Sequence, residues 1–90
     1  MIEKLLDNYY FKKLKNKVER YMNVMYFLSL DYYIEYKDEH LYLYVKKVKY
    51  ANYTKLLTIN KDFFLSNLVN FQKLCDTIDS YVSLYNKEEE

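Results

Sequence analysis

The chain has 90 residues, a formal net charge of +1 and a hydrophobic fraction of 51%. That length fits one small domain, and the apolar fraction supplies a core and excludes an intrinsically disordered chain. The small net charge excludes an overall polyelectrolyte attraction to nucleic acid or to an anionic membrane.

The rest of the composition points to an intracellular protein. Cys75 is the single cysteine, so an intramolecular disulfide cannot form, which favours a reducing compartment. No stretch approaches the roughly 18 apolar residues of a membrane span, and the N-terminal residues lack the pattern of a secretory signal. We therefore expect a cytoplasmic protein, in the cell that encodes it or in a host cell.

The absence of Gly, Pro and Trp beside 13 Tyr is typical of an A/T-rich genome, such as that of some viruses and mobile elements, so tyrosine content alone carries no functional argument.

The first predicted element is an amphipathic helix over residues 2–23. Its apolar residues recur every three or four positions, as expected for a helix with one buried face. The stripe consists of Ile2, Leu6, Tyr10, Leu14, Val18, Tyr21 and Met25. Because the chain has no glycine, Asn23 is the expected left-handed residue at the end of this helix.

Residues 28–47 are predicted to form a β-hairpin, because their apolar residues recur at every second position. The turn, Lys37–His40, lacks an Asn-Gly pair, so a four-residue loop around a type I turn is expected. Leu28 and Leu30 begin the inner face, which continues with three pairs: Tyr36 with Leu41, Ile34 with Leu43, and Tyr32 with Val45. The outer face has three further pairs: Glu35 with Tyr42, Tyr33 with Tyr44, and Asp31 with Lys46. The aromatic pair and the opposite-charge pair on the outer face are each worth about 0.2–1 kcal/mol, and a shift by one residue would scramble both faces.

A third strand and a second helix complete the chain. The strand follows a turn near Ala51 and continues the antiparallel meander, with Tyr53, Lys55, Leu57 and Ile59 on one face and Thr54, Leu56 and Thr58 on the other.

One helix then starts at Phe64, with Asn60 or Asp62 as its cap. Its apolar seam has heptad-like spacing: Phe64, Leu68, Phe71, Cys75, Ile78, Val82 and Tyr85. Residues 88–90 are all glutamate and are expected to fray, because negative charge is unfavourable at the C-terminus of a helix.

The predicted fold is therefore a two-layer α+β domain over residues 1–87, in the order helix, strand, strand, strand, helix, followed by an acidic tail at residues 88–90. A three-stranded antiparallel meander carries two long helices on one face.

The sequence offers no constellation of residues for catalysis. Cys75 lies on the apolar seam, where a thiol is usually inert, and His40 lies in the hairpin turn. One His and one Cys give no spaced set of metal ligands, and phosphate- and dinucleotide-binding loops need glycine. Asp76 and Asp79 lie one turn apart, on the side of the last helix that we expect to face solvent. We therefore expect a non-enzymatic protein with no cofactor and no metal site.

Protein binding is the function that best explains the remaining apolar residues. The outer sheet face presents rigid, amphipathic rings next to a lysine, and we expect the partner to contact Tyr33, Tyr42, Tyr44 and Lys46. The last helix is apolar beyond its seam, so a homodimer is expected to form through Leu74, Tyr81 and Leu84. The predicted function is a small interaction module that binds a larger protein. A regulator or inhibitor encoded by a virus or mobile element would suit its size and composition.

A nucleic-acid-binding domain is the alternative. Lysine-rich blocks at residues 12–20 and 46–61 are more basic than the net charge implies, because the acidic residues gather elsewhere. Tyrosines on the outer sheet face could stack on bases. The candidate contacts to nucleic acid are Lys12, Lys13, Lys15, Lys17, Arg20, Lys46, Lys47 and Lys49.

Overall fold

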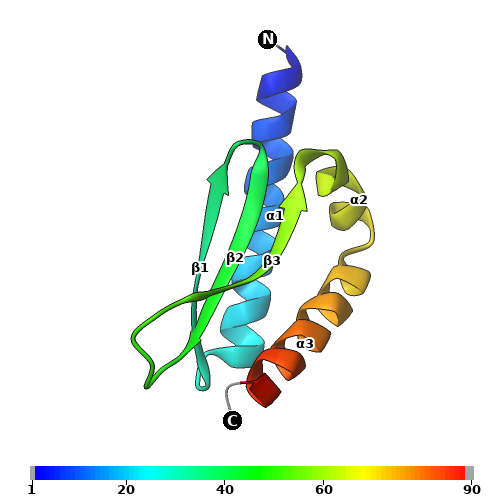
Figure 1. Ribbon diagram of the computed structural model, residues 1–90. Helices are drawn as coiled ribbons and strands as arrows, with labels where there is room; N and C mark the ends of the chain where they lie inside the picture. Colours follow the sequence, from blue (N-terminus) through cyan, green and yellow to red (C-terminus); the bar gives the residue numbers. More distant parts are fainter. Residues whose placement is uncertain (1, 89–90) are drawn as a thin grey trace.

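The chain folds as a three-stranded antiparallel sheet with helices on one of its faces (Figure 1). The computed structural model describes residues 2–88, and the side chains of residues 8–88. The elements are, in order, α1 (Ile2–Tyr26), β1 (Leu30–Lys37), β2 (His40–Lys47), β3 (Thr54–Asn60), the 3-10 turn η1 (Lys61–Phe63), α2 (Phe64–Val69) and α3 (Phe71–Glu88). This confirms the predicted α+β architecture. Of the predicted acidic tail, Glu88 is the last residue of α3 and residues 89–90 lie outside the described part.

Helix α1 packs an apolar stripe on the sheet, as predicted. Leu14, Val18 and Met22 have at most 1% of their surface exposed. Met25, which was expected in the same stripe, is 54% exposed, so that prediction is wrong. The side chains of the predicted stripe residues 2 and 6 lie outside the described part of the chain.

The end of α1 also differs from the prediction. The helix continues through Tyr26, and the next turn is closed by a hydrogen bond from the Ser29 N–H to the Tyr26 carbonyl at 3.0 Å. Asn23 is therefore a helical residue and not a left-handed cap. Its side-chain oxygen accepts a hydrogen bond from the Tyr32 hydroxyl at 2.8 Å, which ties the helix to β1. Leu28, predicted to face the core, lies in this turn and is exposed.

The β1–β2 hairpin has the predicted register along its whole length, with every predicted pair of both faces present. Its turn is different from the one predicted. Asp38 and Glu39 both have positive φ angles, 54° and 63°, and Lys37 pairs with His40. This is a two-residue turn with the geometry of type I′, which matches the right-handed twist of the strands. In a chain without glycine, two acidic residues take the left-handed positions.

Strand β3 pairs antiparallel with β2, as predicted, but a β-bulge divides it into two halves. Leu56 is the extra residue, because the pairing with β2 steps from Leu57 to Lys55. Leu57 and Ile59 are buried in the core. On the other side of the bulge, Tyr53 and Lys55 contact rings on the outer sheet face. The predicted single alternation along the whole strand is therefore wrong.

The predicted last helix is two helices with a break at Asn70. This residue has φ −120° and ψ 61°, which interrupts the helical backbone. The predicted seam still runs across the break, and most of its side chains are buried: Phe64, Cys75, Ile78, Val82 and Tyr85. Asn60 acts as a cap, as expected, since its side-chain oxygen accepts a hydrogen bond from the Asp62 N–H at 2.8 Å. The cap starts η1, which leads directly into α2.

The core lies between the sheet and the helix layer. The central strand β2 contributes three side chains with no exposed surface, Leu41, Leu43 and Val45. Ile78 of α3 and Phe64 of α2 complete the contact from the helix side. None of the described helices is long and apolar enough to cross a membrane.

Candidate interaction surfaces

The outer face of the sheet, away from the helices, carries a connected cluster of aromatic rings. Tyr33 and Tyr44, which are cross-strand partners, stack with their ring centroids 4.5 Å apart and their planes at 12°. Tyr53 meets Tyr33 edge-on at 4.7 Å and 80°. The ring centroid of Tyr42 lies 6.4 Å from that of Tyr44. We call Tyr33, Tyr42, Tyr44 and Tyr53 the tyrosine face.

The two stacked rings of the tyrosine face stand on the sheet and do not lie flat on it. Partners on neighbouring strands stack at 4.5 Å only when each ring turns a flat side toward the other. The parts that point to solvent are therefore ring edges and phenol hydroxyls. Tyr33 and Tyr53 are each 40% exposed. The surface offers apolar edges and hydrogen-bonding groups, and few open ring faces.

Two lysines cover further ring surface on the tyrosine face. The Nζ of Lys55 lies 4.6 Å from the centroid of the Tyr42 ring, and the Nζ of Lys46 lies 5.5 Å from that of Tyr53. Lys46 also donates a hydrogen bond to Asp31 Oδ2 at 3.0 Å. The Lys46 charge is thus already paired within the chain.

The Tyr33 hydroxyl remains protonated in this environment. Desolvation within the ring cluster raises its pKa, and the neighbouring Tyr44 and Glu35 raise that pKa further. At neutral pH the hydroxyl can therefore donate a hydrogen bond to a partner as well as accept one.

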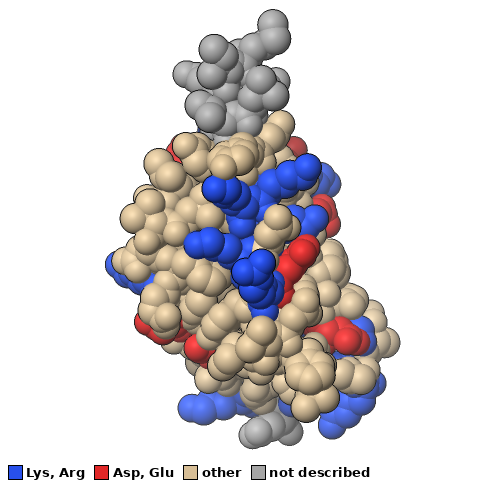
Figure 2. Space-filling model, turned by 180° about the vertical axis from the view of Figure 1, so that it is seen from behind, with Lys and Arg blue, Asp and Glu red and all other residues tan. Residues whose placement is uncertain are grey.

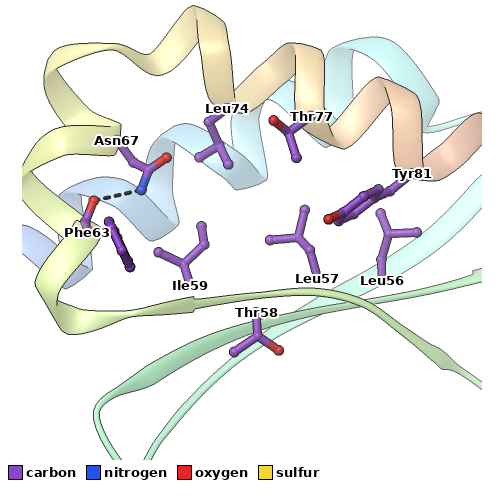
Figure 3. A pocket seen from close by; sticks show the side chains of 9 residues that line it. All are labelled: Leu56, Leu57, Thr58, Ile59, Phe63, Asn67, Leu74, Thr77 and Tyr81. Atoms are coloured by element: carbon purple, nitrogen blue, oxygen red, sulfur yellow. Dashed lines mark hydrogen bonds between the residues drawn. The ribbon is translucent and has the colours of Figure 1, made fainter.

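A groove runs between β3 and the helices α2 and α3. Its wider part has a volume of about 450 Å³. Figure 3 shows Leu57 and Ile59 on the strand side of this hollow, with Leu74, Thr77 and Tyr81 opposite them on α3. A narrower part of about 180 Å³ continues along α3. It reaches Leu84 and Glu88. Leu56 and Tyr81 line both parts, so the two hollows form one groove.

The residues predicted for a dimer interface take different positions around this groove. Tyr81 and Leu84 are 42% and 55% exposed. Leu74 is 5% exposed and belongs to the chain's own core, so it lines the hollow from beneath. Phe63, which the sequence did not single out, is 55% exposed and borders the wider part of the groove.

The outer side of α1 carries the first lysine block. Seen from behind the sheet, Lys and Arg side chains gather in a band along the middle of this side of the molecule (blue in Figure 2). Among the described side chains of α1, the exposed cations are Lys12, Lys13, Lys17 and Arg20. Lys15 forms an ion pair with Glu19, with 3.9 Å between Nζ and Oε1. A hollow of about 430 Å³ lies at one end of this band, between Arg20, Met25 and Phe71.

The second lysine block lies elsewhere. Lys46 and Lys55 are on the tyrosine face, whereas Lys47 and Lys49 lie over the ring of Tyr50, at 5.8 Å and 5.4 Å from its centroid. Because α1 covers the other face of the sheet, the cations of α1 and those of the tyrosine face are on opposite sides. The structure does not bring the two predicted blocks into one surface.

Asp79 contributes to the contact between α1 and α3. The Tyr21 hydroxyl donates to both carboxylate oxygens at 2.7 Å, and the Tyr26 hydroxyl donates to Oδ1. Burial, followed by the hydrogen bond to this carboxylate, raises the pKa of both phenols well above the ordinary tyrosine value. The prediction that Asp79 faces solvent is wrong, while Asp76 is exposed as expected.

Cys75 and His40, the two reactive side chains singled out in the sequence, lie on different elements of the fold, α3 and β2. Cys75 is 3% exposed, and burial together with Asp79 and Asp76 raises the pKa of its thiol. His40 begins β2, with its Nδ1 2.6 Å from the Asp38 carbonyl oxygen. Within the described part of the chain, no three His, Cys, Asp or Glu side chains form a group that could hold a metal ion.

Sequence reasoning missed two exposed aromatic residues at these surfaces. Tyr53 joins the tyrosine face only because of the bulge at Leu56, and alternation alone could not reveal it. Phe63 lies in η1, a 3-10 turn without an apolar period. Comparisons of the chain with protein-family models, curated proteins and solved structures found no match.

Proposed function

We propose that the protein is a small, non-enzymatic binding module that engages a larger protein through the tyrosine face. The observation that supports this most is a sheet face without helices, on which four tyrosine rings form one cluster. A regulator or inhibitor encoded by a virus or mobile element suits the small size and the biased composition. The free, buried Cys75 suits a reducing compartment inside a cell.

The chemistry of the tyrosine face favours a protein partner. Tyrosine combines a rigid apolar body with a polar end, and fixing it in a complex costs little conformational entropy. Here the rings already hold one another in place, as shown by the 12° stacking of Tyr33 on Tyr44. A preorganised patch of this kind loses less freedom on binding than separate side chains would.

Nucleic acid is the less favoured ligand for two reasons. Base stacking needs open ring faces, and the stack between Tyr33 and Tyr44 covers one face of each ring, while Lys55 lies over the ring of Tyr42. Phosphate contacts need free cations beside the rings, and Lys46 is already paired with Asp31.

We also propose that the chain forms a homodimer through the exposed part of α3. Tyr81 and Leu84 supply apolar surface there, and Phe63 extends it along the groove. This surface is separate from the tyrosine face, so a dimer would present two tyrosine faces to its partner.

The test of partner binding is a pull-down from the organism that encodes the chain, or from its host, with the double variant Tyr33→Ser/Tyr44→Ser. Removing the stacked pair is expected to weaken binding by about 30-fold or more, since central aromatic residues often contribute at least 2 kcal/mol. Affinity for the recovered partner is then measured by calorimetry.

Tyr9→Ser is the matched control, because Tyr9 is an exposed tyrosine on α1, away from the tyrosine face. It should bind the partner like the unmodified chain, and circular dichroism should show that all variants are folded. A double variant that keeps full affinity would show that the partner binds elsewhere.

A further inference from the structure

The side of α3 that borders the groove is a single helical stripe with opposite charges at its two ends. Its members are spaced by four, four, three and four positions, and all are exposed: Lys73, Thr77, Tyr81, Leu84 and Glu88. Lys73 lies in the first turn of α3, and Glu88 is its last residue. An antiparallel copy of the stripe would place each lysine opposite a glutamate.

We propose that a second copy of the chain binds this stripe, with the two α3 helices antiparallel about a two-fold axis beside Tyr81. This rests on the homodimer proposed above and adds its geometry. With the axis between residues 80 and 81, Lys73 faces Glu88 of the second copy, and Thr77 faces Leu84 of the second copy. By symmetry each contact occurs twice, and the two Tyr81 rings lie next to the axis.

The shapes along the stripe complement each other in the same register. Leu84 projects from α3 with 55% of its surface exposed. Thr77 borders the wider part of the groove, a hollow of about 450 Å³ between Phe63 and Tyr81 (Figure 3). Leu84 of each copy would therefore enter the hollow of the other, where Leu56 and Phe63 supply apolar contacts.

Two other arrangements fit the observations less well. Parallel helices would set Lys73 beside Lys73 and Glu88 beside Glu88, which brings like charges together at both ends. An extended peptide could instead pair with β3, which is the edge strand of the sheet. However, the bulge at Leu56 interrupts the regular strand edge, and bulges and lysines are features that protect edge strands from such pairing.

Disulfide cross-linking of the full chain tests this geometry. Tyr81→Cys is expected to give a covalent dimer on oxidation, with twice the chain mass of 11.2 kDa. The double variant Thr77→Cys/Leu84→Cys is expected to cross-link as well. Leu84→Cys alone is the matched control and should not, because an antiparallel pair separates its two copies by about 10 Å along the helix axis, beyond the roughly 7 Å limit of a disulfide. Oxidation of the unmodified chain shows whether the buried Cys75 forms cross-links of its own.

Charge reversal tests the ends of the stripe. Lys73→Glu and Glu88→Lys should each weaken the dimer by about 2- to 30-fold, as expected for losing two exposed ion pairs. Combining them should restore the dimer, because the pairs form again with opposite polarity.

Light scattering on the unmodified chain separates failure of the geometry from failure of the dimer. A monomer at high concentration would overturn both. A dimer in which Leu84→Cys cross-links alone, or Tyr81→Cys does not, would keep self-association but overturn the antiparallel register. A monomer whose β3 amides gain protection from hydrogen exchange when a partner protein is added would instead identify strand addition at the groove.

Discussion

Asp79 shows how a single carboxylate can organise the contact between two helices. It accepts hydrogen bonds from Tyr21 and Tyr26, which both lie near the C-terminal end of α1. Hydrogen bonds to a charged acceptor are shorter and stronger than neutral ones. The sequence did not reveal this role, because an acid one turn from Asp76 has the spacing of a solvated helix face. The partners lie more than 50 residues away.

We predict that Asp79→Asn destabilises the protein by about 1–2 kcal/mol, because the two phenols lose a charged acceptor in a partly buried site. Chemical denaturation followed by circular dichroism measures the change in the free energy of unfolding. Asp76→Asn is the matched control on the exposed side of α3 and should change it by less than about 0.5 kcal/mol. Equal effects of the two variants would mean that the tyrosine contacts do not stabilise the helix pair.

At the scale of elements, the hairpin could be predicted and its turn could not. The strand register follows from alternation, since a slip of β2 by one residue would expose Leu41 and Leu43 and bury Lys46. The turn depends on backbone conformation. Without an Asn-Gly pair nothing in the sequence marks Asp38 and Glu39 as left-handed residues.

The bulge in β3 and the break at Asn70 escaped prediction for a related reason. The apolar seam from Phe64 to Tyr85 keeps its spacing through Asn70, so the pattern describes one helix although the backbone forms two. In β3 the extra residue is Leu56, an apolar residue that shows no local sign of a bulge. Patterns of side chains locate buried faces, but they do not record single residues at which the backbone departs from regular geometry. This is why Tyr53 was missed at the tyrosine face.

The hairpin turn gives a prediction about stability. Glu39→Gly should stabilise the protein by about 0.5–1 kcal/mol, because a left-handed conformation is unfavourable for glutamate and free of steric cost for glycine. The Glu39 side chain forms an exposed ion pair with Lys61 at 3.2 Å, and losing that pair should change the free energy of unfolding only slightly. Urea denaturation measures the change. Glu39→Ala is the control, since it removes the same ion pair but keeps a side chain at a φ angle of 63°. A destabilised Glu39→Gly protein would show that the ion pair outweighs the backbone strain.

At the scale of the whole molecule, the net charge of +1 conceals two different sides. On the outer side of α1 the cations gather in one band, and Lys13 and Lys17 there lie over the rings of Tyr9 and Phe71. On the tyrosine face, Lys55 lies over Tyr42 and Lys46 is paired with Asp31. The sequence could locate both lysine blocks but not their separation, because that depends on which sheet face α1 covers. A partner that contacts one side cannot use the cations of the other.

This separation predicts how the chain should treat nucleic acid. We expect a random single-stranded oligonucleotide to bind weakly and only at low salt, through the exposed cations of α1. Four phosphate contacts give a slope of log K against log salt concentration no steeper than about −3. Lys12→Gln/Lys17→Gln should reduce this binding, and Lys46→Gln/Lys55→Gln, the matched pair on the tyrosine face, should leave it unchanged. Fluorescence anisotropy over a salt series measures both. Binding that persists at physiological salt and is lost in the Lys46/Lys55 variant would assign the tyrosine face to nucleic acid and not to a protein partner.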